Sequence, residues 1–111
     1  MKKYFAYIML TCLVNTVSAQ SDPATELAAK IADRMRDSLS LRSSQRDSLY
    51  TINMSLHTQK MAARQQHTAS EALRQATQEL ENKRDGLYRT VFNNEEKYQL
   101  YLSKKQHLIS N

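Results

Sequence analysis

Three residues in one short stretch of the chain could bind a soft metal ion. Met54, His57 and Met61 are spaced i, i+3 and i+7, which places them on one face of a helix. Thioether and imidazole ligands suit Cu(I). A lone histidine near two methionines at the edge of a helical core is more often an exposed surface residue, and we favour that interpretation. His67 and His107 have no partner at ligand spacing, so we expect both to be exposed, and a zinc site could form only across a dimer.

Other patterns that could carry out catalysis are missing from the sequence. A single glycine, Gly86, excludes Gly-rich phosphate-binding loops and the Gly-x-Ser-x-Gly nucleophile elbow. There is no Cys-x-x-Cys and no His-Glu-x-x-His. No nucleophile has an evident base nearby in the chain. The sequence therefore predicts neither an enzyme nor a bound cofactor.

The first residues of the chain have the layout of a secretory signal peptide. Lys2 and Lys3 precede a mostly apolar run, Tyr4 to Val14. This run is about half as long as a membrane-spanning helix, which disfavours a retained anchor. Val17-Ser18-Ala19 then matches the small-residue pattern that a signal peptidase cleaves. We expect export to the periplasm with cleavage after Ala19.

Removal of residues 1–19 changes the composition of the chain. A lipoprotein site at Cys12 is disfavoured because Leu13 and Val14 continue the apolar run. Cleavage removes 19 of the 111 residues and leaves 92, with 14 basic residues against 11 acidic ones, a charge of about +3. That is too weakly basic to predict a nucleic-acid partner. The only cysteine also leaves, so residues 20–111 are expected to form a single domain without disulfides.

Residues 20–111 are typical of an all-α protein. One proline, one glycine and many strong helix formers favour helices throughout. Polar breaks between apolar stripes predict four helices, near 22–40, 43–66, 68–91 and 94–109, with the two long ones forming an antiparallel hairpin flanked by the short ones. A continuous helix over 44–91 is the alternative. The predicted stripes are Leu27, Ile31, Met35 and Leu39; Leu49, Ile52, Leu56 and Ala63; Leu73, Ala76, Leu80, Leu87 and Val91; and Tyr98, Tyr101, Leu102, Leu108 and Ile109.

Capping patterns mark the predicted helix starts. Asp22 followed by Pro23 opens the first helix. Thr68 and Glu71 have the spacing of a capping box, and so do Asn93 and Glu96. Gly86 lies inside the third stripe, where it is expected to be tolerated at a cost of about 1 kcal/mol.

Two segments before helices share one pattern. Leu41 and Gln45 in LSLRSSQ are followed much later by Phe92, Asn93 and Glu96 in FNNEEKY. The layout resembles the Spy/CpxP family of periplasmic stress proteins, which carry a pair of Leu-Thr-x-x-Gln motifs before the second and the last helix. In such a motif the threonine caps the helix and the glutamine bonds back to it. Arg42 stands where threonine is expected and has no acceptor, so Ser43 or Ser44 is expected to take over the cap.

The resemblance implies a function and an assembly. Members of the family are small helical proteins that form cradle-like dimers; some are ATP-independent chaperones, others modulate envelope-stress signalling, and relatives bind metals. The resemblance therefore implies a homodimer that binds unfolded envelope proteins. A metal-binding sensor or buffer and a protein-binding regulator are the alternatives. Once the leader is cleaved, no stable membrane insertion is expected.

The surface chemistry of the long helices is compatible with client binding. Methionines next to cations can hold many unfolded chains weakly, through apolar contact and through attraction of acidic segments. Ordinary packing of the methionines and a solvated basic face are the simpler interpretations. Lys83 and Arg84 are further basic positions on these helices. The candidate client-binding residues are Met54, Leu56, Lys60, Met61, Arg64 and Arg74.

Overall fold

The computed structural model describes residues 22–110, which form four α-helices and no strand. The helices are α2 (Pro23–Leu39), α3 (Ser43–Gln66), α4 (Ser70–Phe92) and α5 (Glu95–Ile109). The all-α prediction and the division into four helices are confirmed, and the alternative of one helix over 44–91 is wrong because the chain leaves the helix at residues 67–69. The expected leader, residues 1–19, lies outside the described residues.

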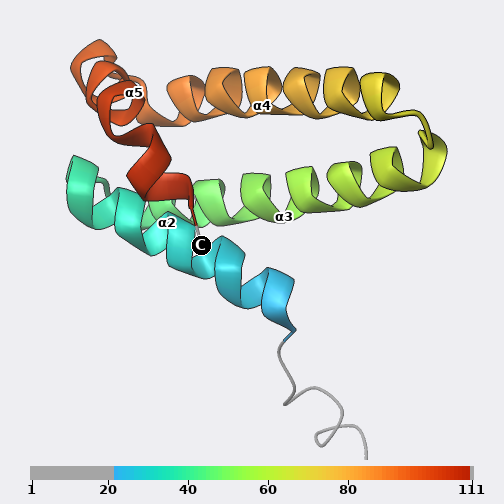
Figure 1. Cartoon of the computed structure of the whole chain (residues 1–111). Coiled ribbons are helices and arrows are strands. Elements are labelled where there is room, and N and C mark those ends of the chain that lie inside the picture. Colours follow the sequence, from blue (N-terminus) through green and yellow to red (C-terminus); the bar gives the residue numbers. More distant parts are fainter. Residues whose placement is uncertain (1–21, 111) are drawn as a thin grey trace, which may run out of the picture.

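The long helices α3 and α4 run antiparallel, with residues 67–69 turning the chain at the tip (Figure 1). α2 packs against α3, and α5 folds back from the end of α4 to reach α2. The two shorter helices therefore close one end of the hairpin, while its tip projects from the opposite end. None of the described helices is long and apolar enough to cross a membrane.

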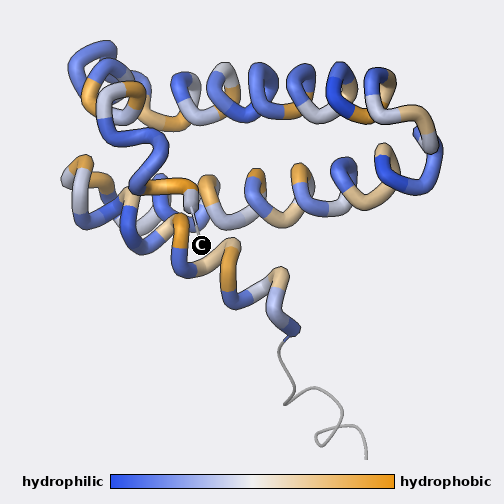
Figure 2. The backbone as a smooth tube through the Cα atoms, in the orientation of Figure 1, coloured by the Kyte–Doolittle hydropathy of each residue, from blue (hydrophilic) through white to orange (hydrophobic). Residues whose placement is uncertain are grey.

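The hydrophobic core lies at the closed end of the hairpin, where all four helices meet. Met35 and Leu49 are fully buried there beside Tyr88, Phe92 and Tyr101. The rings of Tyr88 and Tyr101 meet edge to face, with centroids 5.4 Å apart. Figure 2 shows apolar segments of α3 and α4 mainly on the sides of the two helices that face each other. The projecting part of the hairpin has a narrower apolar seam, in which Leu56 and Ala63 are the buried α3 residues.

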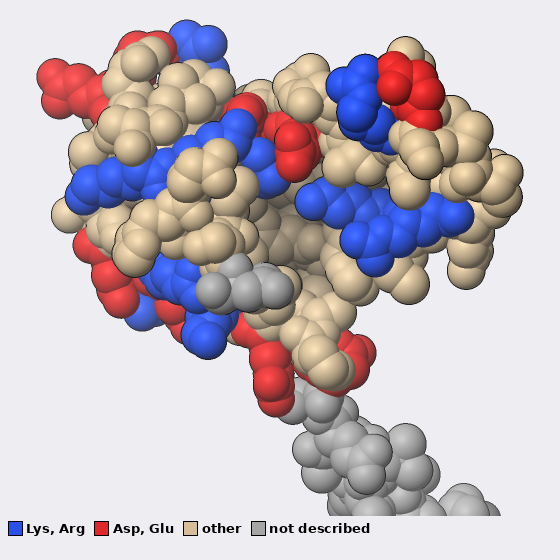
Figure 3. Space-filling model, viewed as in Figure 1, with Lys and Arg blue, Asp and Glu red and all other residues tan. Residues whose placement is uncertain are grey.

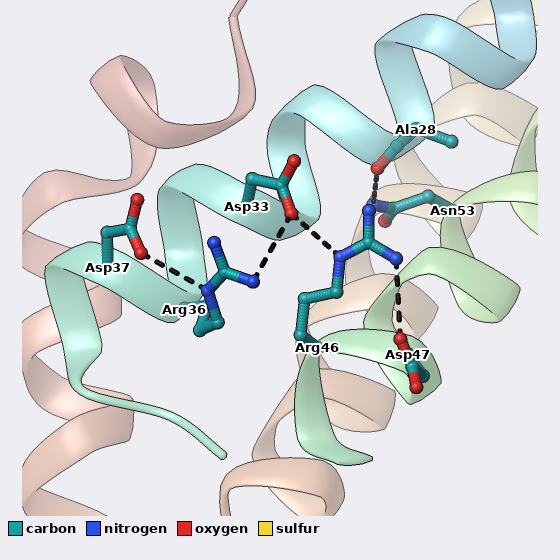
Figure 4. Close-up of polar contacts among 7 residues, drawn as sticks. All are labelled: Ala28, Asp33, Arg36, Asp37, Arg46, Asp47 and Asn53. Atoms are coloured by element: carbon teal, nitrogen blue, oxygen red, sulfur yellow. Dashed lines mark hydrogen bonds and ion pairs between the residues drawn. The ribbon is translucent and has the colours of Figure 1, made fainter. Parts of the chain in front are cut away.

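Polar contacts fix α2 against α3 (Figure 4). Arg46 Nε lies 2.7 Å from Asp33 Oδ1, and Asn53 Nδ2 donates to the Ala28 carbonyl over 3.1 Å. The hydrogen bond from Arg46 holds the pKa of the Asp33 carboxyl below its usual range. Arg36 also reaches Asp33, at 3.8 Å. The contacts from Arg46 and Asn53 set the position of α2 along the hairpin, whereas the Arg36–Asp33 pair lies within α2.

Side chains of α2 and α5 satisfy each other's C-terminal carbonyls. Lys97 Nζ donates to the Ser40 carbonyl over 2.9 Å, at the end of α2. Arg34 Nη1 donates to the Ser110 carbonyl over 2.6 Å, at the end of α5. Cations at helix C-termini are favourable because the last carbonyls there lack partners and carry partial negative charge. The two short helices are therefore linked at both ends.

Three of the predicted caps differ from the structure, namely those at Ser43 or Ser44, at Thr68 and at Asn93. The α5 cap is Asn94, whose Oδ1 accepts from the Lys97 N–H over 3.0 Å, whereas Asn93 ends α4 in a left-handed conformation with φ 47°. Asn tolerates that conformation better than most residues. Asn93 therefore ends α4, and the adjacent Asn94 caps α5. Glu96 consequently lies one position too early for a capping box.

The predicted box at Thr68 is also wrong. α4 begins at Ser70, and its N-cap residue, Ala69, has no side-chain acceptor. Glu71 instead bonds Arg74, with Oε1 and Nη2 2.6 Å apart. By contrast, the predicted cap at Asp22 is confirmed, since its Oδ1 accepts from the Thr25 N–H over 2.8 Å.

The apolar face of α4 is rotated from the predicted stripe. Leu87 is 37% exposed, while Arg84, Tyr88 and Phe92 are buried. Those three residues follow Leu80 at intervals of four, which is also a helical face. Leu102 of α5 is likewise exposed, at 39%. The sequence pattern failed here because a buried arginine does not register as part of an apolar stripe.

Candidate binding groove

A half-open groove of about 370 Å³ lies between α2 and the α3–α4 hairpin. All four helices contribute to it, because α2 crosses the hairpin where the end of α5 also arrives. Figure 3 shows a hollow near the middle of this face, with Lys and Arg side chains at its borders and Asp or Glu side chains above it. The lining residues are Ala24, Leu27, Ala28, Ile31, Asn53, Leu56, His57, Lys60, Met61, Arg64, Leu80, Arg84, Tyr88 and Ile109.

The α3 wall of the groove follows from helical spacing. Leu56, Lys60 and Arg64 recur every four residues, which stacks them along one face of α3. Leu56 is only 5% exposed and belongs to the floor. Met61 is 43% exposed and lies beside Arg64, whose Nη1 is 4.0 Å from the Met61 sulfur. The wall therefore changes from apolar to cationic along α3.

The groove lining contains cations but no carboxylate. Lys60 and Arg64 form no ion pair with any described residue, and Lys60 forms no side-chain hydrogen bond either. Outside the lining, Asp22 at the start of α2 lies near enough to His57 for this side chain to act on its carboxyl group. The Thr25 hydrogen bonds chiefly lower the pKa of the Asp22 carboxyl, and His57 adds a smaller effect in the same direction.

The α4 wall contains a buried cation, Arg84, which is 7% exposed. Its Nε and Nη2 each lie 3.4 Å from Asp85 Oδ1. Asp85 has closer partners: Tyr101 donates to Oδ1 over 2.7 Å and Lys105 Nζ to Oδ2 over 2.6 Å. Burial acts to raise the pKa of the Asp85 carboxyl, but the bonds from Lys105 and Tyr101 outweigh it and hold that pKa below its usual range. The Asp85 carboxylate thus pairs with both Arg84 and Lys105, and the cluster keeps a net positive charge.

The amide of Asn53 is fully engaged at the floor of the groove. It donates to the Ala28 carbonyl and accepts from the Tyr88 hydroxyl. Tyr88 is 1% exposed, and this burial raises the pKa of its hydroxyl and keeps it protonated. The floor consequently offers a ligand no free amide.

The structure brings together four of the six candidate client-binding residues. Leu56, Lys60, Met61 and Arg64 all line the groove. Met54 is partly buried and lies outside the lining. Arg74 is exposed on α4, where it pairs with Glu71. Helical spacing on α3 was sufficient to group the four that meet.

Sequence reasoning missed the walls supplied by other helices. Leu27 and Ile31 of the predicted α2 stripe are only partly buried and line the groove. Arg84 was expected as a surface cation. Its position four residues from both Leu80 and Tyr88 was the available signal, since both neighbours face the groove.

The motif residues form a second cluster, away from the groove, that joins α3 to α4. Gln45 Oε1 accepts from the Arg42 N–H over 2.9 Å, as the motif predicts. Its Nε2 donates to the carbonyls of Val91 and Phe92, over 3.0 and 3.4 Å, at the end of α4. Ser43 is the first helical residue rather than the cap, which falls on Arg42 without a side-chain bond. Leu41 and Phe92 are both buried in the core.

The three proposed metal ligands do not converge on one site. His57 and Met61 line the groove, whereas Met54 does not. Among the described residues there is also no group of three His, Cys, Asp or Glu side chains placed to hold a metal ion.

Comparison with known proteins gives no relative. No protein-family model, no curated protein and no solved structure matches the chain.

Proposed function

We propose that this protein is an exported, ATP-independent chaperone or envelope-stress accessory that binds unfolded clients in the groove. The observation that carries the proposal is an open apolar groove lined by Lys60, Arg64 and Arg84 with no acid in its lining. Apolar walls can accept aliphatic side chains, and Lys60 and Arg64, which form no ion pair with a described residue, attract acidic segments. The resemblance of the motif segments to the Spy/CpxP family supports the same function, and export would place the protein away from ATP.

The direct test is suppression of aggregation. The mature chain, residues 20–111, is mixed at increasing ratios with a chemically denatured client, with chelator present or with copper or zinc added. We expect suppression that rises with the ratio and is indifferent to chelator. No suppression under any condition would contradict the proposal.

A metal-binding sensor or buffer is the second candidate, favoured by His57 and Met61 lining one groove. Calorimetric titration with Cu(I) and Zn²⁺ tests it. Tight binding that is lost in the Met54→Ala/His57→Ala variant, in a protein without aggregation suppression, would favour this function. Absence of both activities would favour a protein-binding regulator.

We also propose that the protein acts as a homodimer. Met61, Leu87, Leu100 and Leu102 remain exposed, and a small domain without disulfides gains stability when a second copy covers apolar surface. Light scattering after size exclusion should give twice the chain mass. A monomer at micromolar concentration would contradict this assembly.

A further inference from the structure

The α3 wall of the groove carries positive charge that nothing in the described chain neutralises. Residues 48–70 contain no Asp or Glu. Lys60 and Arg64 lie one turn apart, and like charges at this spacing destabilise a helix. Lys60 is also partly buried on the groove wall, which adds to the cost of its charge. Repulsion between like charges in a helix whose other residues favour folding is typical of a binding site.

The opposite wall adds a third cation. Arg84 lines the groove from α4, while its neighbour Asp85 is occupied by Tyr101 and Lys105. An anion in the groove would therefore meet cations from two helices. The charge of the site is complementary to an anion and unfavourable for a cation.

The polar groups of the groove are almost all donors. Lys60, Arg64 and Arg84 only donate, and the amide of Asn53 is occupied by Ala28 and Tyr88. An anionic head group needs donors alone. This excess of donors favours a ligand whose polar group is an anion.

The remaining walls fit an alkyl chain. Leu27, Ile31, Leu56, Leu80 and Ile109 surround a volume of about 370 Å³, which is at the lower end of the range for small-molecule sites. A groove of this size holds one chain.

We propose that the groove is a binding site for a single-chain amphiphile with an anionic head, such as a fatty-acid carboxylate or an alkyl phosphate monoester. The head would lie between Lys60, Arg64 and Arg84, and the chain along the apolar residues of α2, α4 and α5. This inference does not depend on the chaperone proposal, because it requires only the groove and its charges.

Calorimetric titration of the mature protein tests the site. Dodecanoate, below its micelle concentration, should bind with one molecule per chain, and its affinity should exceed that of shorter carboxylates by about fourfold per methylene group. Dodecyltrimethylammonium has the same chain with the opposite charge and should bind at least about tenfold more weakly. Dodecyl phosphate identifies the preferred head: tighter binding than dodecanoate assigns a phosphate ligand, and weaker binding a carboxylate.

Matched variants locate the binding. Lys60→Gln/Arg64→Gln should weaken dodecanoate binding about tenfold or more. Lys30→Gln/Lys104→Gln removes the same charge from exposed positions outside the groove and should leave the affinity unchanged. Ala24→Phe should block the groove and abolish binding of both anions while circular dichroism shows the helices intact.

Three results would overturn the proposal. The first is equal affinity for the anionic and the cationic amphiphile. The second is an equal loss of dodecanoate affinity in the groove variant and in the exposed-site control variant. The third is binding accompanied by loss of helicity, which would indicate detergent-like unfolding. Because the readout is amphiphile binding, its failure would leave aggregation suppression unaffected, and the two proposals can fail separately.

Discussion

At the scale of single residues, Gln45 uses both ends of its amide to join two helices. Its oxygen closes the start of α3, and its nitrogen reaches two carbonyls at the end of α4. Only 9% of its surface is exposed, so water cannot fully replace these bonds. Gln45 thereby satisfies backbone groups that helix ends otherwise leave unpaired.

Substitution of Gln45 by alanine should therefore destabilise the fold. We expect Gln45→Ala to lower the free energy of unfolding by about 1–3 kcal/mol, because buried backbone groups lose their partners. Urea denaturation measures this change. Gln65→Ala, on an exposed position of the same helix, is the control and should stay within about 0.5 kcal/mol of the wild type. Equal effects of the two variants would contradict the role assigned to Gln45.

The Asp85 cluster predicts a pH dependence of stability. The pKa of its carboxyl is lowered in the folded state, against an ordinary value of about 3.9 in the unfolded chain. The stabilisation by the Asp85 carboxylate is therefore complete above its pKa in the unfolded chain. It is lost as the pH falls through its pKa in the folded protein. Between about pH 5 and pH 2, unfolding experiments on Asp85→Asn should show a smaller loss of stability than on the wild type.

The exposed Asp37 provides the matched control for this pH series. Its side chain is 71% exposed and contacts only the adjacent Arg36, and surface pairs of this kind contribute little. Asp37→Asn should therefore follow the wild-type pH profile. If Asp85→Asn follows it as well, the carboxylate does not stabilise the cluster in solution.

At the scale of helices, Gly86 is a weak point within α4. A Cβ added there meets nothing within 4 Å, and glycine inside a helix costs about 0.5–1 kcal/mol relative to alanine. Gly86→Ala should raise the free energy of unfolding by that amount, and the midpoint of thermal unfolding by several degrees, at about 4–8 °C per kcal/mol. A lower midpoint would mean that a second chain approaches Gly86 closely in solution.

Helix number and approximate bounds could be predicted from the sequence because local signals determine them. Asp22 and Pro23 start α2, and helix formers fill each predicted span. The caps at Thr68 and Asn93 were wrong because several polar residues compete at each break. At residues 93–94 only the tertiary structure shows which asparagine ends α4 and which begins α5.

The groove could be predicted only in part. Its α3 wall follows from spacing within one helix, which the sequence contains. Its α2 and α4 walls depend on how the helices cross, which spacing does not specify. The burial of Arg84 depends on Asp85 together with Tyr101 and Lys105 of α5. The periodicity of one helix does not show which side chains of another helix pair with it.

At the scale of the whole molecule, the four helices leave a cationic groove open instead of closing around it. The core at one end holds α2 and α5 together, and the projecting hairpin carries Lys60 and Arg64 beyond that core. A rigid end that supports an open basic groove suits weak binding of varied acidic, apolar segments. Attraction between charges supplies part of this binding, so the affinity should fall as salt rises, because the screening length is about 8 Å at physiological ionic strength.

The central claim is that the groove binds unfolded clients through these cations. Its most direct test is fluorescence anisotropy of a labelled, permanently unfolded acidic client, titrated at low and high salt with wild type, Lys60→Glu/Arg64→Glu and the exposed-site control Lys30→Glu/Lys104→Glu. We predict that the groove variant binds at least about tenfold more weakly and loses most of its salt dependence, while the control stays close to wild type. Unchanged binding and unchanged salt dependence in the groove variant would contradict the claim. Lys60 and Arg64 would then be solvated side chains that do not contribute to client binding.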